Sequence, residues 1–206
     1  MDWVRWLIGW PDRDPAQALA GKVVLLTGAS SGIGREIALQ LGRVGARLVL
    51  ASRDNAALLQ LRSQIINSEH AGRQVEQPAV LGLDLADLPS LQSRAEEALA
   101  VWGKLDILVH CAGQTVRAAA LDTELAVYQQ LLAVNFLGCC ELTRACGAAL
   151  RESRGQVAVV GSVQVGRWRC RGCKGCRCDV CRACCPLPTA RPTLLASMRC
   201  RPGRTA

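Results

Sequence analysis

A short apolar run, a glycine-rich turn and a helical pattern follow one another near the start of the chain, and this order constrains the fold most. Residues 23–27 (VVLLT) predict a buried strand, and residues 28–34 read Gly-Ala-Ser-Ser-Gly-Ile-Gly. The helix that follows has its expected apolar face at Ile33, Ile37, Leu41 and Val44. Glycines at such a turn let the backbone turn sharply and come close to a phosphate, and the helix N-terminus offers free N–H groups. The order predicts a strand–turn–helix unit with a phosphate site.

The alternation of short apolar runs with amphipathic stretches continues to about residue 160. We expect further strands at residues 47–52, 80–84, 105–110 and 156–161, and helices at 54–66, at 125–150 and up to Trp102. Asp87 and Ser90 are candidate N-caps for the helix that ends at Trp102. Strands that alternate with helical crossovers predict an α/β fold, a Rossmann-like doubly wound parallel sheet.

Charge and cysteine are unevenly distributed along the 206 residues. The chain has 25 basic and 17 acidic side chains, but residues 167–206 hold nine Arg and one Lys against one acid, Asp179. Eight of the twelve cysteines lie in the same stretch. We therefore divide the chain into an N-terminal segment (1–20), a nucleotide-binding domain (21–165) and a Cys/Arg-rich tail (166–206). The positive charge belongs to the tail and carries no information on what the domain binds.

The tail permits three interpretations. The abrupt change to Arg, Cys, Gly and Pro is typical of a shifted reading frame or a retained intron, and we favour this origin and a disordered tail. Repeated C-x2-C spacing between Cys170 and Cys185 is also the spacing of zinc ligands. An arginine-rich arm for nucleic acid is the third reading. We assign no metal ligand and expect no nucleic-acid partner.

Two features bear on location. Trp3, Trp6 and Trp10 fall on one face of a possible amphipathic helix that Pro11 would end, so a shallow membrane contact stays open beside a frayed N-terminus. Cys111, Cys139, Cys140 and Cys146 lie in apolar context and are expected to be buried free thiols. This favours a reducing compartment, with the chain cytoplasmic or loosely attached to a membrane.

The chain contains several motifs in the same order as they occur in one known enzyme family. They are Thr27-Gly-Ala-Ser-Ser-Gly-Ile-Gly34, Leu83-Asp84-Leu85, Ala112-Gly113, Val134-Asn135-Phe136 and Gly161-Ser162. Over residues 20–165 the chain resembles the short-chain dehydrogenases/reductases. The resemblance implies an NAD(P)(H)-dependent oxidoreductase that interconverts carbonyls and alcohols, and the stretch GKLDILVHCAG is most similar to the branch acting on steroids, retinoids and other lipid-like molecules.

The resemblance also implies residue roles. Arg53, just after the second strand and helped by Arg35, would pair with a 2′-phosphate, which favours NADP over NAD. Asp84, in the Leu83-Asp84-Leu85 motif, would bind the adenine amino group. The remaining cofactor contacts would come from the turn and from the fourth strand: Gly28, Ser30, Ser31, Gly32, Ile33, Gly34, Leu85, Ala112 and Gly113.

The chain departs from the family pattern in two places. His110 stands where the family has an asparagine, and we expect a structural group rather than a catalytic one. Ser162 and Asn135 match the serine that holds the substrate oxygen and the asparagine of the water relay, but the family's Tyr-x-x-x-Lys is absent. The single tyrosine, Tyr128, precedes Asn135.

We therefore expect impaired catalysis. A non-enzymatic nucleotide- or partner-binding variant is the first alternative, and metal binding by the tail is the second. The family's helix after the fifth strand is missing too, so the sheet is expected to be truncated there with an exposed edge. That helix also contributes to the family dimer, which argues against a homo-oligomer.

Overall fold

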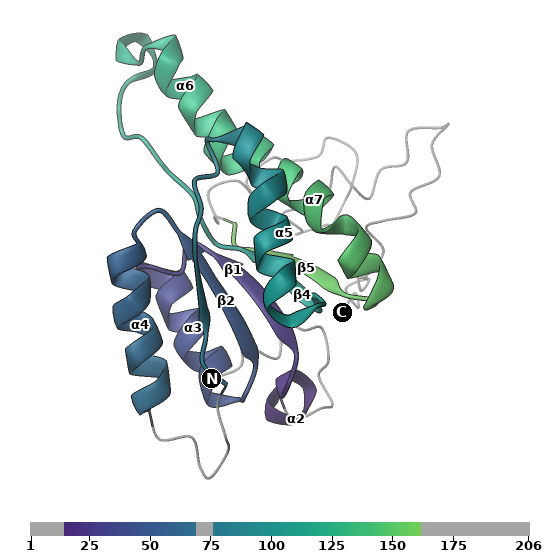
Figure 1. Cartoon of the computed structure of the whole chain (residues 1–206). Helices are drawn as coiled ribbons and strands as arrows, with labels where there is room; N and C mark the ends of the chain where they lie inside the picture. Colours follow the sequence, from purple (N-terminus) through teal and green to yellow (C-terminus); the bar gives the residue numbers. More distant parts are fainter. Residues whose placement is uncertain (1–14, 69–75, 162–206) are drawn as a thin grey trace, which may run out of the picture. The chain divides into compact units, whose positions relative to one another are not determined.

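The computed structural model describes residues 15–68 and 76–161, and its described helices and strands form one α/β domain (Figure 1). The strands are β1 (Val23–Thr27), β2 (Arg47–Ser52), β3 (Ala79–Gly82), β4 (Ile107–His110) and β5 (Gln156–Val159). The helices are α2 (Pro15–Leu19), α3 (Gly32–Arg43), α4 (Asn55–Asn67), α5 (Leu91–Trp102), α6 (Leu125–Leu132) and α7 (Gly138–Glu152), with short turns η1 (Leu88–Ser90), η2 (Ala120–Asp122) and η3 (Ala133–Leu137).

The five strands are parallel and lie in the order β3-β2-β1-β4-β5. Leu25 at the centre of β1 pairs with Val49 of β2 on one side and with Leu108 of β4 on the other. The chain therefore moves outward from β1 first in one direction and then in the other. The order reverses beside β1, and in open parallel sheets ligands bind outside the carboxyl ends of the strands at this point. The Rossmann-like expectation is confirmed.

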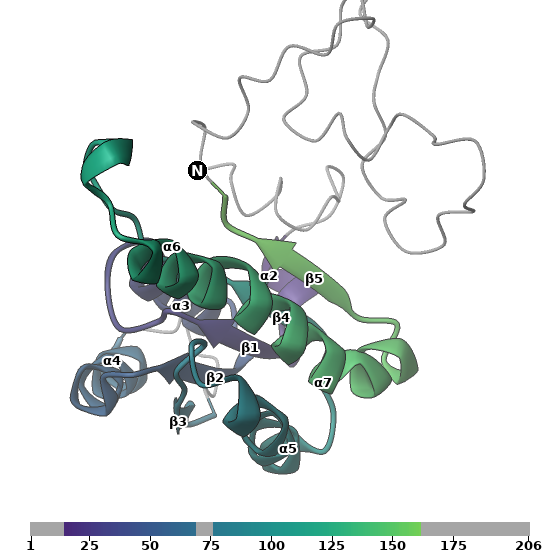
Figure 2. The same ribbon diagram turned by 90° about the horizontal axis from the view of Figure 1, so that it is seen from above.

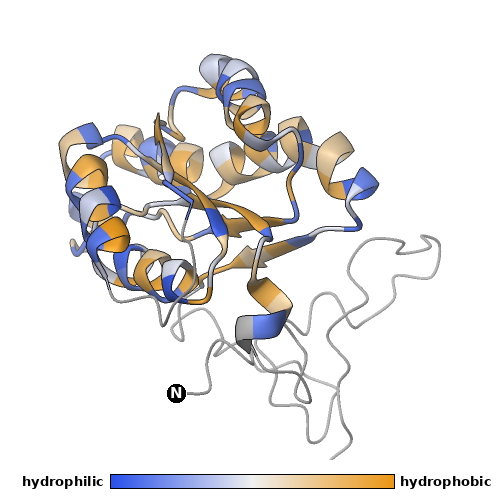
Figure 3. Cartoon of the chain, turned by 60° about the horizontal axis from the view of Figure 1, so that its bottom comes forward, coloured by the Kyte–Doolittle hydropathy of each residue, from blue (hydrophilic) through white to orange (hydrophobic). Residues whose placement is uncertain are grey.

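Helices cover both faces of the sheet (Figure 2). Leu25 packs in a core cluster with Leu142 of α7, whereas its neighbour Leu26 packs in a second cluster with Ile37 of α3 and Leu58 of α4. Successive residues of a strand point to opposite faces, so an uninterrupted apolar strand fills both clusters. In Figure 3 the strands are accordingly mostly hydrophobic, while hydrophilic segments lie on the helices around them.

The apolar face predicted for the first long helix is wrong at its first residue. Ile37 and Leu41 are buried, but the side chain of Ile33 is 64% exposed. Ile33 lies in the first turn of α3, at the carboxyl edge of the sheet, where β1 has already ended. The tertiary arrangement thus leaves an isoleucine open beside the glycine turn.

The four cysteines of the domain are free thiols, but they are not all buried as expected. Cys146 is fully buried in the cluster under α7, where burial raises the pKa of its thiol to about 11. Cys111 and Cys139 are half-buried, and Cys140 is exposed. Residues 139 and 140 are adjacent on one helix, so only one of them can face the sheet.

The long helix expected at 125–150 is present but is built in three parts. A π-helical turn, η3, separates α6 from α7. Leu142, Cys146 and Leu150 of α7 are buried, whereas α6 has no buried residue. By length and composition the helix Leu125–Glu152 could cross a membrane. One face of its α7 part packs in the domain core.

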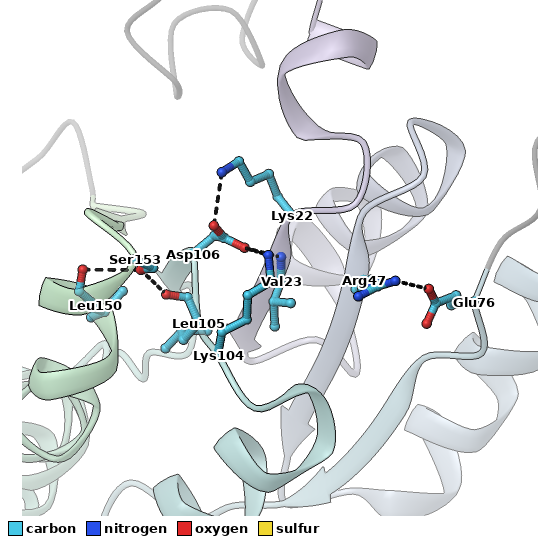
Figure 4. Close-up of polar contacts among 9 residues, drawn as sticks. All are labelled: Lys22, Val23, Arg47, Glu76, Lys104, Leu105, Asp106, Leu150 and Ser153. Atoms are coloured by element: carbon cyan, nitrogen blue, oxygen red, sulfur yellow. Dashed lines mark hydrogen bonds and ion pairs between the residues drawn. The ribbon is translucent and has the colours of Figure 1, made fainter.

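At the amino edge of the sheet, Asp106 holds the start of β1 (Figure 4). Its carboxylate accepts a hydrogen bond of 2.9 Å from the Val23 N–H and forms ion pairs with Lys22 (3.0 Å) and Lys104 (3.1 Å). Nearby, Ser153 Oγ donates to Leu105 O at 2.5 Å, which ties the end of α7 to the loop that leads through Asp106 into β4.

Strand β5 forms the exposed edge that the sequence predicted. Within the described residues it pairs only with β4, and its Val157 and Val159 side chains are 46% and 68% exposed. The chain divides into the units Met1–Val160 and Gly161–Ala206, and all described helices and strands belong to the first. The Trp-rich segment, Ser162 and the Cys/Arg-rich tail lie outside the described residues, so the predictions made for them stay predictions.

Candidate functional site

The glycine turn between β1 and α3 requires glycine at three positions. At Gly34, a Cβ would collide with the backbone O of Gly28. Gly28 has a φ of +69°, and a Cβ there would lie 2.6 Å from the backbone N of Ala112. Gly32 has a φ of +52°, but a Cβ there would meet no protein atom within 4 Å. Gly28 lets the turn pack against the chain after β4, and Gly32 leaves open space above the turn.

The first turn of α3 faces this open space with free backbone donors. Ser31 is the N-cap residue, yet its side chain makes no capping hydrogen bond. The N–H groups at a helix start have no partner within the helix and carry a partial positive charge. Ser31, Gly32 and Ile33 are all exposed, so an anion can reach them. The residues predicted to hold a phosphate thus lie together and open at the carboxyl end of β1, and their role in binding stays a prediction.

Thr27 connects the glycine turn to the segment after β4. Its buried Oγ1 donates to Val109 O at 3.3 Å and accepts from the N–H groups of Cys111 at 3.2 Å and Ala112 at 3.3 Å. On the other side of β1, the N–H of Ala29 donates to Ala51 O of β2 at 3.3 Å. These bonds fix the turn between the two neighbouring strands, which brings the predicted residue Ala112 to the site.

The predicted adenine-side residues follow β2 and β3. The Leu83 N–H donates to Ser52 O at 2.9 Å, which holds the two strand ends together. Asp84 Oδ1 accepts from the Ala86 N–H at 2.9 Å and so stabilises its own turn, and Leu85 is buried beneath it. A carboxylate has further acceptor sites, so Asp84 keeps capacity for a ligand amino group.

Two basic side chains lie near the glycine turn, and both contact a glutamine. Arg35 of α3 donates to Gln64 Oε1 of α4 at 2.7 Å. Arg53 is exposed just after β2, and its Nη1 and Nη2 both lie 3.3 Å from the side-chain oxygen of Gln114, in the amide orientation that satisfies both groups. Because β1 lies between β2 and β4, this second contact passes over the carboxyl end of β1.

Asn135, the predicted water-relay residue, lies in the π-helical turn η3 and holds the chain after β4. Its Oδ1 accepts from the Gln114 N–H at 2.8 Å, and its Nδ2 donates to Gln114 O at 2.8 Å. A Cβ at Gly113 would lie 3.4 Å from the same Oδ1. Asn135 thus positions Ala112, Gly113 and Gln114, and π-turns are frequent at functional sites.

His110 links β4 to α7. Its Nε2 lies 2.8 Å from Thr143 Oγ1, which itself donates to Cys139 O at 2.7 Å. Thr143 must therefore accept from His110, which places the proton of the neutral ring on Nε2. Nδ1 is buried without a hydrogen-bond partner in the described part of the chain, and burial lowers the pKa of His110 to about 4. The side chain thus joins β4 to α7 through one of its two nitrogens, and the expectation that it has no catalytic role stays a prediction.

A groove of about 540 Å³ lies next to this loop, and the sequence analysis did not predict it. Gln114, Thr115, Val116, Ala126, Val127, Gln130 and Leu131 line it. Most of this lining is apolar. The apolar residues of α6 could have indicated such a groove. Their periodicity alone, however, is the same for a helix that lines a groove and for a helix buried in the core.

Taken together, the parallel sheet, the open glycine turn at the switch point and the free helix N-terminus define a dinucleotide-binding α/β domain of the Rossmann type. Comparison with known proteins narrows this class. The short chain dehydrogenase family model matches residues 22–169, and the chain belongs to this family.

Its relatives agree with this assignment. The chain is 37% identical over 150 residues to a dehydrogenase/reductase SDR family protein 7-like of Anopheles gambiae. The matched region covers 72% of this chain and 47% of the relative. It is 36% identical over 155 residues to the human dehydrogenase/reductase SDR family member 7. This match covers 75% of this chain and 45% of the human protein. The chain thus spans about half the length of the curated relatives it matches.

Two solved structures show the same fold. An alcohol dehydrogenase from the archaeon Thermococcus sibiricus, complexed with 5-hydroxy-NADP, matches with a TM-score of 0.66 and 27% identity over 72% of this chain and 61% of that one. A metagenomic short-chain oxidoreductase in complex with NADP matches with a TM-score of 0.64 and 32% identity over 74% and 67%.

Proposed function

We propose that this chain binds NADP(H) along the carboxyl edge of the sheet, with the pyrophosphate at the glycine turn. The open space over Gly32 carries this proposal, because it lies next to free helix N–H groups at the switch point. Arg53 and Arg35 are the basic groups that would receive a 2′-phosphate, and the two structural neighbours that bind NADP or its derivative support the choice of NADP over NAD. When bound, the nicotinamide would supply or accept a hydride.

Carbonyl/alcohol interconversion is the reaction class that family membership supports, and the chain's own residues supply only part of it. Asn135 is present, but both ends of its amide hold Gln114. Tyr128, the single tyrosine of the chain, lies on α6 and is followed four residues later by Leu132 rather than lysine. We infer that the 206-residue chain binds the cofactor but turns over poorly. The apolar groove beside Gln114 supports a lipid-like substrate.

A matched pair of glycine variants tests the binding site. Gly32→Ala and Gly45→Ala both add a Cβ at positive φ, +52° and +78°, with no protein atom within 4 Å. Each should lose roughly 1–2 kcal/mol of stability. Only Gly32→Ala should weaken NADPH binding, by more than about tenfold, in a fluorescence titration, because Gly45 lies in the turn between α3 and β2. Equal NADPH affinity of the two variants would reject the proposed site.

Turnover with NADPH and a panel of apolar ketones and aldehydes tests the second part. We expect saturable NADPH binding with little or no oxidation above background, and no further change in Tyr128→Phe. Rapid turnover that Tyr128→Phe abolishes would show that this tyrosine donates the proton, contrary to the proposal. A nucleotide-binding protein without enzymatic activity is the remaining candidate function, and binding without any turnover would favour it.

A further inference from the structure

The contact between Arg53 and Gln114 lies across the proposed cofactor site. Arg53 follows β2 directly, and Gln114 follows β4 by four residues, while β1 and its glycine turn lie between these strands. With the Gln114 amide in the orientation that satisfies both groups, Nη1 and Nη2 of Arg53 are each 3.3 Å from the Gln114 side-chain oxygen. A guanidinium that a neutral amide already holds must give up that contact before it can pair with a phosphate.

Gln114 is well placed for this contact because its backbone is fixed. Asn135 binds both its N–H and its C=O at 2.8 Å, so the residue cannot shift along the edge of the sheet. These bonds involve the backbone only, and the side chain of Gln114 is free of them. Replacing that side chain should therefore leave the loop after β4 in place.

We propose that Gln114 is a specificity-determining residue that competes with the 2′-phosphate of NADP(H) for Arg53. The inference rests on the proposed function, in which this edge holds a nicotinamide dinucleotide. A 2′-phosphate offers Arg53 two charged acceptors in place of one neutral oxygen, so it displaces Gln114. The 2′-hydroxyl of NAD(H) offers no such exchange and leaves Arg53 with Gln114. Gln114 thus weakens the response to the 2′-phosphate and leaves the rest of the cofactor unaffected.

Two adenosine fragments isolate this effect. Both 2′,5′-ADP and 5′-AMP contain the adenosine and a 5′-phosphate, and they differ only in the 2′-phosphate. The ratio of their Kd values, 5′-AMP over 2′,5′-ADP, measures what the 2′-phosphate contributes. It is read by calorimetry on the full 206-residue chain.

Removal of the competing oxygen should raise this ratio. In Gln114→Ala we expect the Kd ratio to increase about five- to tenfold. The increase is limited because an exposed hydrogen bond to a charged group contributes only modestly to the free energy. In Gln114→Glu the ratio should fall below the wild-type value, because a carboxylate holds Arg53 more tightly and repels the phosphate. In an Arg53→Ala background, Gln114→Ala should leave the ratio unchanged.

Gln92→Ala is the matched control. Gln92 Oε1 also accepts from an arginine, Arg144, at 3.4 Å, but on the outer surface of α5 and α7. It should leave the ratio at the wild-type value, and circular dichroism checks that every variant folds. The inference would be overturned if the wild-type Kd ratio is above one and Gln114→Ala leaves it unchanged or lowers it. The proposed function would still stand in that case. Failure of the wild-type chain to bind NADPH or either fragment would overturn both.

Discussion

The side-chain amide of Asn135 is bound at both ends to the backbone of a single residue, Gln114, with two hydrogen bonds of 2.8 Å. This pairing joins the π-helical turn of the long helix to the chain that leaves β4. The residue that the family resemblance assigns to a water relay is therefore also a clamp. It determines where Ala112 and Gly113 lie with respect to the glycine turn.

Loss of this clamp should affect both stability and binding. We expect Asn135→Ala to lower the free energy of unfolding by about 1–3 kcal/mol, because two hydrogen bonds are lost and the Gln114 backbone groups need new partners. NADPH affinity should fall by several-fold as the loop after β4 loosens. Urea unfolding and an NADPH titration measure the two effects. Wild-type values in both would show that Asn135 does not hold this loop.

Gly28→Ala should destabilise the domain more than Gly32→Ala or Gly45→Ala, whose Cβ atoms would meet no protein atom. Its Cβ would lie 2.6 Å from Ala112 N, in addition to the strain of a φ of +69°. Because backbone surrounds the position, no flexible side chain can move aside. We expect a loss of stability of more than about 3 kcal/mol, the upper end for local backbone strain. Thermal unfolding of Gly28→Ala and Gly45→Ala provides the comparison, because Gly45→Ala introduces the backbone strain without the steric clash. Equal losses of stability in the two variants would contradict the structure.

The Asp106 carboxylate should stabilise the domain fully above about pH 4, and this stabilisation should be lost progressively at lower pH. Burial raises its pKa, but the Val23 N–H and the ion pairs with Lys22 and Lys104 lower it more, so the pKa is below its usual range. A depressed carboxyl pKa contributes stability above the unfolded-state value of about 3.9, and the contribution is lost as the pH falls through the folded value.

Asp106→Asn keeps an acceptor for Val23 but removes the charge. We expect a loss of about 1–2 kcal/mol at pH 7, since both lysines are nearly half exposed and their ion pairs are screened. The difference between variant and wild type should shrink below pH 4. Urea unfolding at pH 7 and pH 3.5 measures it, and a difference that stays constant across this range would exclude the charge as its source.

His110 should make the domain less stable in mild acid. Burial lowers its pKa to about 4 from the usual 6.5, so the fold favours the neutral ring. Below pH 6.5 the unfolded chain takes up the proton and the folded chain does not, so stability falls until about pH 4. A shift of this size corresponds to about 3 kcal/mol in total.

The variant His110→Asn, which installs the family residue, should remove this dependence. Its free energy of unfolding relative to wild type should improve steadily from pH 7 to pH 4.5, by about 2–3 kcal/mol. Chemical denaturation of both proteins across this range gives the comparison. Parallel pH profiles would show that His110 is not buried as a neutral group.

The sequence by itself determined the type and order of the elements. The apolar runs at 23–27 and 47–52 became β1 and β2 with the expected bounds, because strands buried on both faces need uninterrupted apolar residues. The glycine spacing predicted the turn, since Gly28 packs where no other residue fits. These features depend on local chain geometry, which the order of residues specifies.

Contacts between distant segments depended on tertiary structure. Ile33 looked like part of a buried helix face, but the sheet ends before its turn, so it is exposed. Nothing in the sequence pairs Asn135 with Gln114 or Arg53 with Gln114, because their distances depend on how the ends of β2, β4 and the long helix converge. Periodicity specifies which residues share a face of one element, and only the packed sheet decides which side chains from different elements meet.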